Sequence, residues 1–167
     1  VHIDVCGLQE VNDARGRPAG DAVLRGIAGR FSVFAAEHGQ ITIARTGGDE
    51  FALLGTLHLK QDPNALVRLL KERLSAPHSA DVPAVATDVC IGFAVYSAES
   101  AAAGTPTDAA AELSRQADVA LSLAKRDGPG CWRRYNAEDD DRIRHRALLK
   151  QSLLRGIGEE QFEMHYH

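Results

Sequence analysis

The stretch Arg45-Thr46-Gly47-Gly48-Asp49-Glu50-Phe51 joins two short apolar runs, residues 41–45 and 50–54, and it organises the interpretation of the whole chain. The two runs are typical of strands, and a Gly-Gly pair between such runs predicts a hairpin. Because glycine has no Cβ, a hairpin tip of this kind lets the backbone come close to a ligand. An ordinary turn without a ligand is the alternative for this segment taken alone.

Three carboxylates belong to this part of the chain. Asp49 and Glu50 directly follow the glycines, and on a strand they point to opposite faces, so that each can meet a different part of a ligand. Asp4 lies in an alternating apolar run at residues 1–5, which predicts a first strand. A buried carboxylate needs a partner or a metal. If the first strand neighbours the hairpin, these oxygens suit Mg²⁺, which takes carboxylates together with phosphates and water.

The composition excludes several classes of protein. The chain has 167 residues, of which 44% are hydrophobic and 25% charged, so it can bury a core. Its net charge of -4 argues against non-specific nucleic-acid binding, and we expect no DNA partner. Three scattered cysteines are too few for a disulfide framework. No apolar run reaches the roughly 18 residues of a membrane helix and no signal peptide is present, so we expect a cytoplasmic domain, with any membrane anchor of the full-length protein before Val1.

Hydrophobic periodicity predicts elements in the order β-α-α-β-β-α-β-α-β. The expected strands are residues 1–5, 41–45, 50–54, 85–95 and 131–135. The expected helices are a short one before Gly16, a long one from Asp21 to Gly39, one that Pro63 opens, and one after Asp108 that ends at Gly128. Helices interleaved with an antiparallel hairpin predict an α+β fold with a mixed, mostly antiparallel central sheet flanked by helices.

Several motifs, in order along the chain, resemble the GGDEF domains, a family that includes the diguanylate cyclases. Residues 47–51 read as the family's signature letter for letter, and residues 4–13 are similar to its D-x-D-x-F-K-x-I-N-D stretch. Residues 16–24 resemble the G-H-x-x-G-D-x-x-L continuation, and residues 117–128 resemble the A-D-x-A-L-Y-x-A-K-x-x-G segment. The resemblance covers about residues 1–135 and is more specific than any one short motif.

The resemblance implies a ferredoxin-like fold of the nucleotidyl-cyclase palm type, with a site for GTP and Mg²⁺ or Mn²⁺. By family analogy the metal ligands are Asp4, the Val5 carbonyl, and Asp49 or Glu50. Asp49 and Glu50 are also the implied catalytic residues. The residues implied to bind GTP are Asn12 and Asp21 at the guanine, Gly47 and Gly48 against the triphosphate, and Lys125 at the phosphates.

The implied chemistry is nucleotidyl transfer in bacterial signal transduction. Two GTP molecules give cyclic di-GMP and pyrophosphate when the 3′-hydroxyl of each attacks the α-phosphate of the other. Each domain of the family binds one GTP, so the resemblance also implies a homodimer of GGDEF domains. Metal ions neutralise the charge that develops at the phosphates, and positioning supplies most of the remaining acceleration.

Four departures from the family pattern leave the activity open. Cys6 replaces the second Asp of the first strand, Gln9 stands where the family usually has Lys, and Pro129 occupies the place of a common Arg. These changes remove charges beside the metal and the phosphates, although Arg17 stands where the family has a His. The chain is therefore either a diguanylate cyclase of weak activity or a catalytically degenerate module that senses GTP or dimerises and regulates an adjacent phosphodiesterase domain.

The composition changes after residue 135. Residues 136–145 are interpreted as an acidic linker, with a charged helical pattern from Arg142 onward. Residues 146–167 resemble the first helix and strand of an EAL domain, the cyclic di-GMP phosphodiesterase module that often follows a GGDEF domain. We therefore expect a GGDEF domain at 1–135, without its usual lead-in, and an intramolecular EAL domain in a longer tandem protein.

Overall fold

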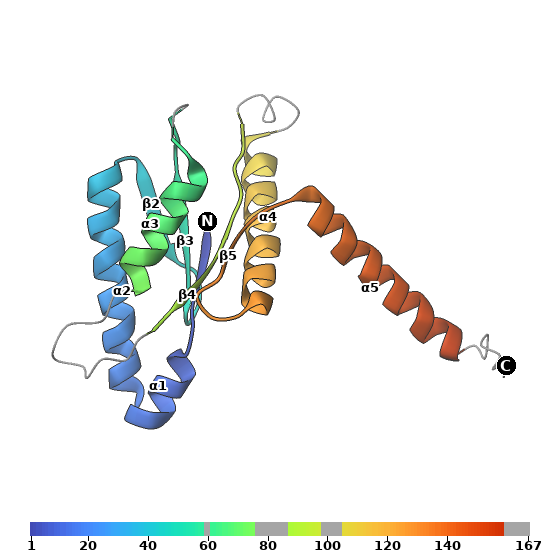
Figure 1. The fold of residues 1–167 in the computed structure, drawn as a ribbon, viewed down its shortest axis with the longest axis horizontal. Helices are drawn as coiled ribbons and strands as arrows, with labels where there is room; N and C mark the ends of the chain where they lie inside the picture. Colours follow the sequence, from blue (N-terminus) through green and yellow to red (C-terminus); the bar gives the residue numbers. More distant parts are fainter. Residues whose placement is uncertain (59–60, 76–86, 98–104, 159–167) are drawn as a thin grey trace. The chain divides into compact units, whose positions relative to one another are not determined.

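Figure 1 shows the ribbon of a computed structural model of the chain, in which ten elements follow one another as β1-α1-α2-β2-β3-α3-β4-α4-β5-α5 among the described residues. The structure describes residues 1–58, 61–75, 87–97 and 105–158. The chain divides into two units, residues 1–135 and residues 136–167, and each is described by itself.

The first unit is built on one sheet with the strand order β2-β3-β1-β4-β5. The strands are β1 His2–Val5, β2 Ile41–Arg45, β3 Glu50–Gly55, β4 Val89–Phe93 and β5 Trp132–Arg134. All neighbouring strands are antiparallel except β4 and β5, which are parallel. The predicted fold class, a mixed and mostly antiparallel sheet with flanking helices, is confirmed.

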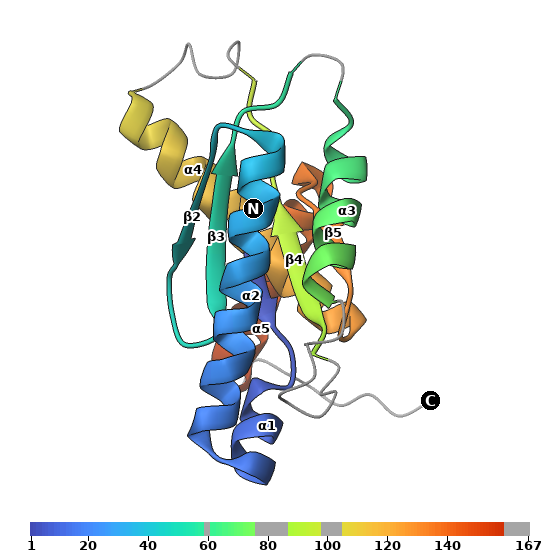
Figure 2. The same ribbon diagram turned by 90° about the vertical axis from the view of Figure 1, so that its left-hand side faces the viewer.

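Helices cover both faces of this sheet. The helices are α1 Leu8–Arg15, α2 Arg17–His38, α3 Pro63–Ser75, α4 Pro106–Asp127 and, in the second unit, α5 Ala137–Gly158. α2 and α3 lie on one face of the sheet and α4 lies on the other (Figure 1, Figure 2). None of the helices within the described ranges is long and apolar enough to cross a membrane.

The two faces of the sheet are packed differently. The face under α2 and α3 buries large side chains, and Phe31 of α2 meets Phe51 of β3 with ring centroids 5.2 Å apart. On the other face α4 approaches β4 closely at Gly92, where a methyl group would place its carbon 2.5 Å from the Leu121 Cα and nearer still to the Ala117 carbonyl oxygen. Only glycine fits there, and this close approach holds α4 against the centre of the sheet.

Three helix boundaries differ from the sequence prediction. α4 begins at Pro106 rather than after Asp108, and the Thr105 side chain caps it by accepting a hydrogen bond from the Asp108 amide. α2 begins at Arg17 rather than at Asp21, because Pro18 is tolerated in the first turn, where its missing N–H has no helical acceptor to lose. α5 begins at Ala137 rather than at Arg142, so the acidic residues expected in a linker form its first turns. Carboxylates are favourable at a helix N-terminus, which explains why an acidic run continues into the helix. The assignment of residues beyond 135 to a second domain stays a prediction.

The fourth strand is also shorter than predicted. The sequence alternates over residues 85–95, but β4 comprises only Val89–Phe93 and is buried along its whole length. Residues 87, 88, 94 and 95 lie outside the strand, and residues 85 and 86 lie outside the described part. The EAL-like strand expected near residues 161–166 likewise falls outside the described residues.

Candidate functional site

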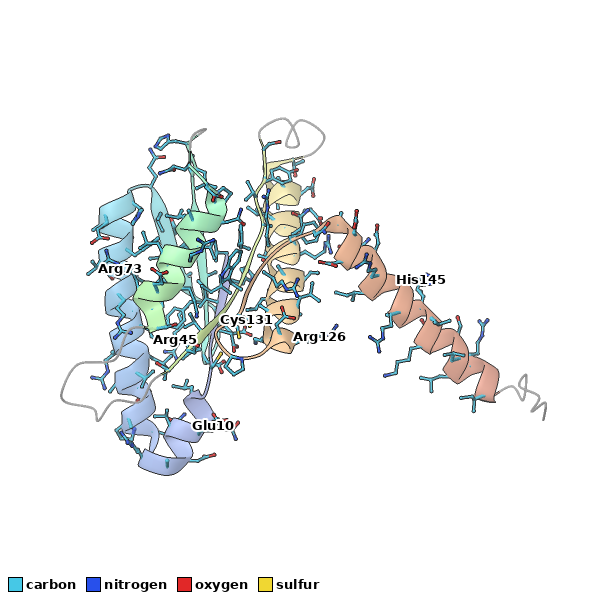
Figure 3. All side chains as sticks on the ribbon, in the orientation of Figure 1. Glu10, Arg45, Arg73, Arg126, Cys131 and His145 are labelled. Atoms are coloured by element: carbon cyan, nitrogen blue, oxygen red, sulfur yellow. The ribbon has the colours of Figure 1, made fainter. Side chains whose placement is uncertain are left out.

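The candidate site lies at the end of the sheet where β1 finishes and the β2–β3 hairpin turns. β1 and β3 are antiparallel neighbours, and Asp4 stands directly opposite Glu50. The Val5 amide donates a hydrogen bond of 3.0 Å to the Asp49 carbonyl, which fixes the hairpin beside the end of β1. Figure 3 labels Arg45, Arg126 and Cys131 at this end of the molecule. The first strand therefore neighbours the hairpin, which was the condition for the predicted carboxylates to converge.

The last turn of α4 contributes Lys125 to the same place. Its Nζ lies 2.5 Å from Asp4 Oδ2 and 3.4 Å from Glu50 Oε1. The sequence predicted a phosphate-binding role for this lysine, and the structure brings its ammonium group to two of the predicted metal-ligating carboxylates. Opposite residues of an antiparallel pair point to the same face, so Glu50 rather than Asp49 is the carboxylate that joins Asp4 there.

Burial and the neighbouring charges shift the pKa values of Asp4 and Lys125 in opposite directions. Burial raises the pKa of Asp4 above its ordinary value of 3.8, and the hydrogen bond from Lys125 offsets only part of that effect. Burial also lowers the pKa of Lys125, but its hydrogen bonds to Asp4 and Glu50 outweigh burial and leave the pKa above its usual value. The short contact and the polar surroundings favour an ionised pair at neutral pH.

The donor set fits a magnesium ion that arrives with a phosphate ligand. Asp4 and Glu50 lie side by side, and Val5 provides a neighbouring backbone carbonyl. In the described ranges, no three carboxylate, thiol or imidazole side chains come together as a complete metal site. Mg²⁺ usually takes one or two protein carboxylates and fills its remaining positions with substrate phosphates and water. The two converging carboxylates, Asp4 and Glu50, therefore match the number of protein carboxylates that Mg²⁺ usually takes.

The tip of the hairpin is held by Arg45, a residue that the sequence interpretation did not single out. Its Nη2 donates to the Gly48 carbonyl at 2.6 Å, and its Nε lies 3.2 Å from the carbonyls of Gly47 and Gly48. The Thr46 amide donates to the Glu50 carbonyl at 3.0 Å and closes the turn. An arginine at the last position of the strand before a glycine turn was the available signal, because its side chain can fold back over the tip.

The two glycines at the tip are not required by the hairpin's own backbone. Neither Gly47 nor Gly48 has a positive φ. A methyl group at Gly48 would meet no atom within 4 Å, and one at Gly47 would lie 3.7 Å from Glu50 Oε2, an ordinary contact. The space at Gly48 is open, so the backbone there is accessible to a bound molecule, whereas the Glu50 carboxylate lies beside Gly47.

A groove of about 540 Å³ connects this hairpin with α2. Asp21, one of the predicted guanine-binding residues, lines it together with Arg45, and Phe31 and Phe51 contribute aromatic walls. Its complete lining is Asp21, Leu24, Arg25, Ala28, Phe31, Ser32, Ile43, Arg45 and Phe51. Mainly apolar walls with a few charged groups are the usual composition of a small-molecule site. The half-buried Asn12 of α1 packs against Gly20, the residue before Asp21.

One departure from the family pattern, Cys6, directly follows the last residue of β1 at the carboxylate end of the site. Cys6 lies with its Sγ 3.3 Å from Cys90 Sγ on the neighbouring strand β4, and burial raises its pKa to about 11. A neutral thiol therefore stands where a second carboxylate was expected. Gln9 and Pro129 are exposed, the first on α1 and the second just after α4.

Comparison with known proteins identifies the family. Residues 1–131 match the family model described as "Diguanylate cyclase, GGDEF domain". The chain belongs to the GGDEF family. It is a GGDEF domain of cyclic di-GMP signalling that is related to diguanylate cyclases, as the motifs predicted.

Among the relatives of this GGDEF domain is MucR of Pseudomonas aeruginosa, a bifunctional diguanylate cyclase/cyclic di-GMP phosphodiesterase, at 30% identity over 98% of this chain and 23% of MucR. The cyclic di-GMP phosphodiesterase PdeR of Escherichia coli is 29% identical over 99% of this chain and 24% of PdeR. This GGDEF domain therefore spans about a quarter of either relative. The crystal structure of the GGDEF domain of TpbB (YfiN) from P. aeruginosa superposes with a TM-score of 0.66 at 33% identity, covering 81% of this chain and 80% of that one.

Proposed function

We propose that this GGDEF domain binds GTP together with Mg²⁺ or Mn²⁺, and that two copies convert two GTP molecules into one cyclic di-GMP and two pyrophosphates. The observation that carries the proposal is the groove that Asp21 and Arg45 line, because Arg45 also holds the glycine hairpin, and Glu50 of that hairpin stands opposite Asp4 on the other face of the sheet. Since the reaction uses cytoplasmic GTP, the proposal also places the domain in the cytoplasm.

In this proposal the nucleotide lies along the groove with its base toward α1 and α2. The Asn12 amide and the Asp21 carboxylate together supply both donors and acceptors, which the edge of guanine requires. The triphosphate lies against Gly47 and Gly48, where open space admits it to the backbone. Arg45 keeps that turn in one conformation through its bonds to the turn carbonyls. One ligand then extends from Asp21 in the groove to the glycine turn beside Arg45.

In the proposal, nucleotidyl transfer takes place at the carboxylate end of the site, where Asp4 and Glu50 converge. Asp4 and Glu50, with the Val5 carbonyl, are the residues that would hold the metal, while Asp49 is the residue just before β3. Bound Mg²⁺ would neutralise charge on the phosphates. Lys125 is near enough to both carboxylates to contact phosphate oxygens bound there. Each transfer forms a bond from a 3′-oxygen to an α-phosphorus, breaks the α–β phosphoanhydride bond and releases the hydroxyl proton, so two facing domains complete the cyclic product.

A second candidate function is favoured by the side chains around the carboxylate end. The neutral Cys6 thiol, the uncharged Gln9 and Pro129 replace groups that would carry charge toward the metal and phosphates. In this alternative the domain binds GTP without turnover, or dimerises, and regulates an adjacent EAL phosphodiesterase domain. The similarity to PdeR, which is named a phosphodiesterase, over nearly the whole chain supports that alternative.

One experiment separates these functions. The full-length protein is titrated with GTP in the presence of Mg²⁺ by calorimetry, and the same samples are assayed for cyclic di-GMP by chromatography and mass spectrometry. Binding with product supports the cyclase, and binding without product supports the regulatory module. Absence of GTP binding contradicts the cyclase and GTP sensing alike. The variant Asp21→Ala is the control that tests whether any binding uses the groove.

A further inference from the structure

Gly20 of α2 makes room for the side chain of Asn12 on α1. A methyl group at Gly20 would place its carbon 2.9 Å from the Asn12 Cγ, 3.2 Å from its Nδ2, and nearer still to its Oδ1. Each of these separations is below ordinary van der Waals contact. Any side chain at position 20 would therefore overlap the Asn12 carboxamide and force it out of its present position.

The backbone of α2 gives no other reason for glycine at this position. Gly20 is buried inside the helix and does not have a positive φ. Glycine in a helix interior costs roughly 0.5–1 kcal/mol of stability relative to alanine. The contact with Asn12 is thus the feature that an alanine would disturb.

The connection between the two helices limits how Asn12 could adapt. The Gly16 amide donates a hydrogen bond of 2.7 Å to the Asn12 carbonyl, and Gly16, with φ of 80°, is the single residue between α1 and α2. The main chain of Asn12 is therefore fixed at the end of α1. Since Asp21 follows Gly20 directly, the same helix turn receives the Asn12 side chain and carries Asp21 into the groove.

We propose that Gly20 is a positioning residue that holds the Asn12 carboxamide against the turn of α2 that carries Asp21 and thereby sets the preference of the site for guanine over adenine nucleotides. This inference rests on the proposed binding of GTP. An amide on α1 and a carboxylate on the adjoining turn of α2 together match the mixed donor and acceptor edge of guanine, whereas adenine presents a different pattern. With the amide displaced, the site keeps Asp21 and the phosphate contacts but loses one of the two groups that recognise the base.

The chain offers a matched control on the same helix. Gly29 also lies inside α2, and a methyl group there would meet no atom within 4 Å. Gly29→Ala changes helix propensity as Gly20→Ala does, but it leaves the contact between α1 and α2 unchanged. A difference between the two variants therefore reports on the Asn12 contact.

The test measures GTP and ATP affinity with Mg²⁺ by calorimetry on the full chain and on four variants: Gly20→Ala, Gly29→Ala, Asn12→Ala and the Asn12→Ala, Gly20→Ala double variant. We expect Gly20→Ala and Asn12→Ala each to weaken GTP binding about tenfold, the equivalent of one lost hydrogen bond to the base, with little change in ATP affinity. We expect Gly29→Ala to bind like the parent. In the Asn12→Ala background, Gly20→Ala should add less than about a twofold effect, because the displaced amide is already absent.

Three results would overturn the inference: unchanged GTP affinity in Gly20→Ala, an equal loss for GTP and ATP, or an equal loss with and without Asn12. If Gly20→Ala does not fold, the double variant must fold and bind as Asn12→Ala does, since the three close atoms are then absent. A double variant that also fails to fold overturns the inference. If the parent chain binds no GTP, the proposed function is refuted. If the parent binds GTP and the Gly20→Ala variant binds it equally well, only the role of Gly20 is refuted.

Discussion

The two ends of the candidate site differ in how far they follow the family pattern. The base end keeps the amide of Asn12 on α1, the carboxylate of Asp21 on α2, and Gly20, against which the Asn12 side chain packs. The phosphate end, around the finish of β1, has a neutral thiol at Cys6 and no positive charge at Gln9. The groups proposed to recognise the nucleotide and those proposed to promote its reaction are therefore separate, so one set can change while the other stays.

The largest effect is expected when the phosphate end loses its central carboxylate. Asp4→Asn removes one of two converging carboxylates and the closest partner of Lys125. We expect any cyclic di-GMP production to fall by about 100-fold or more, since removal of a group that stabilises developing charge has effects of that size. The gain in GTP affinity on adding Mg²⁺ should largely disappear, while affinity measured in EDTA changes little. A variant with an undiminished response to Mg²⁺ contradicts the metal role of Asp4.

The second effect concerns the packing that holds α4, and with it Lys125, against the sheet. Gly92→Ala forces a methyl group onto the backbone of α4, which cannot move aside as a flexible side chain can. Overpacking of this kind costs about 1–3 kcal/mol in the free energy of unfolding. Gly29→Ala, with open space around it, should instead stabilise the chain by roughly 0.4–1 kcal/mol. Urea denaturation measures both, and equal stabilities would show that α4 does not pack on β4 as described.

A third change attempts to restore the phosphate end without touching the base end. The double variant Gln9→Lys, Pro129→Arg adds two positive charges at exposed positions where the family usually carries them. We expect turnover of GTP to rise by about tenfold, because such charges stabilise the transferring phosphate. Affinity for guanosine, which lacks phosphates, should stay the same. If turnover and binding both stay unchanged, Gln9 and Pro129 do not limit the activity, and Cys6 is the next position to alter.

The smallest expected effect lies at Arg45, where the two ends meet. Arg45→Ala removes the donors that hold the Gly47 and Gly48 carbonyls. We expect GTP affinity to fall about fivefold, the size of one or two exposed hydrogen bonds. Arg45→Lys keeps the charge but loses the fork of the guanidinium, and it should weaken binding nearly as much. If the lysine variant binds like the parent, Arg45 acts through its charge rather than by ordering the turn.

Local patterns in the sequence predicted most of the fold. The glycine hairpin, the alternating first strand and the helical spacing each depend on neighbouring residues, and the mixed sheet followed from their order. The errors occurred where local signals are ambiguous. Pro18 interrupts a helix when it lies in the interior but is accepted in the first turn of α2. The acidic residues after Asn136 are consistent with a linker or with a helix N-terminus, and the structure has the helix.

Within the candidate site, contacts between distant segments were beyond sequence reasoning. Lys125 was expected at phosphates, but nothing local indicates that the last turn of α4 lies on the face shared by Asp4 and Glu50. The role proposed for Gly20 could not be predicted from the sequence either, because it depends on how α1 packs against α2. Arg45 orders the hairpin through hydrogen bonds that only the folded turn defines.

Guanine selectivity is tested most directly by calorimetric titration of the full-length protein with GTP and, separately, with ATP in the presence of Mg²⁺. We expect saturable binding of one GTP per chain and at least about tenfold weaker binding of ATP, as follows when an amide and a carboxylate recognise the base. No GTP binding, or equal affinity for the two nucleotides, would contradict a guanine-selective groove between Asp21 and Arg45.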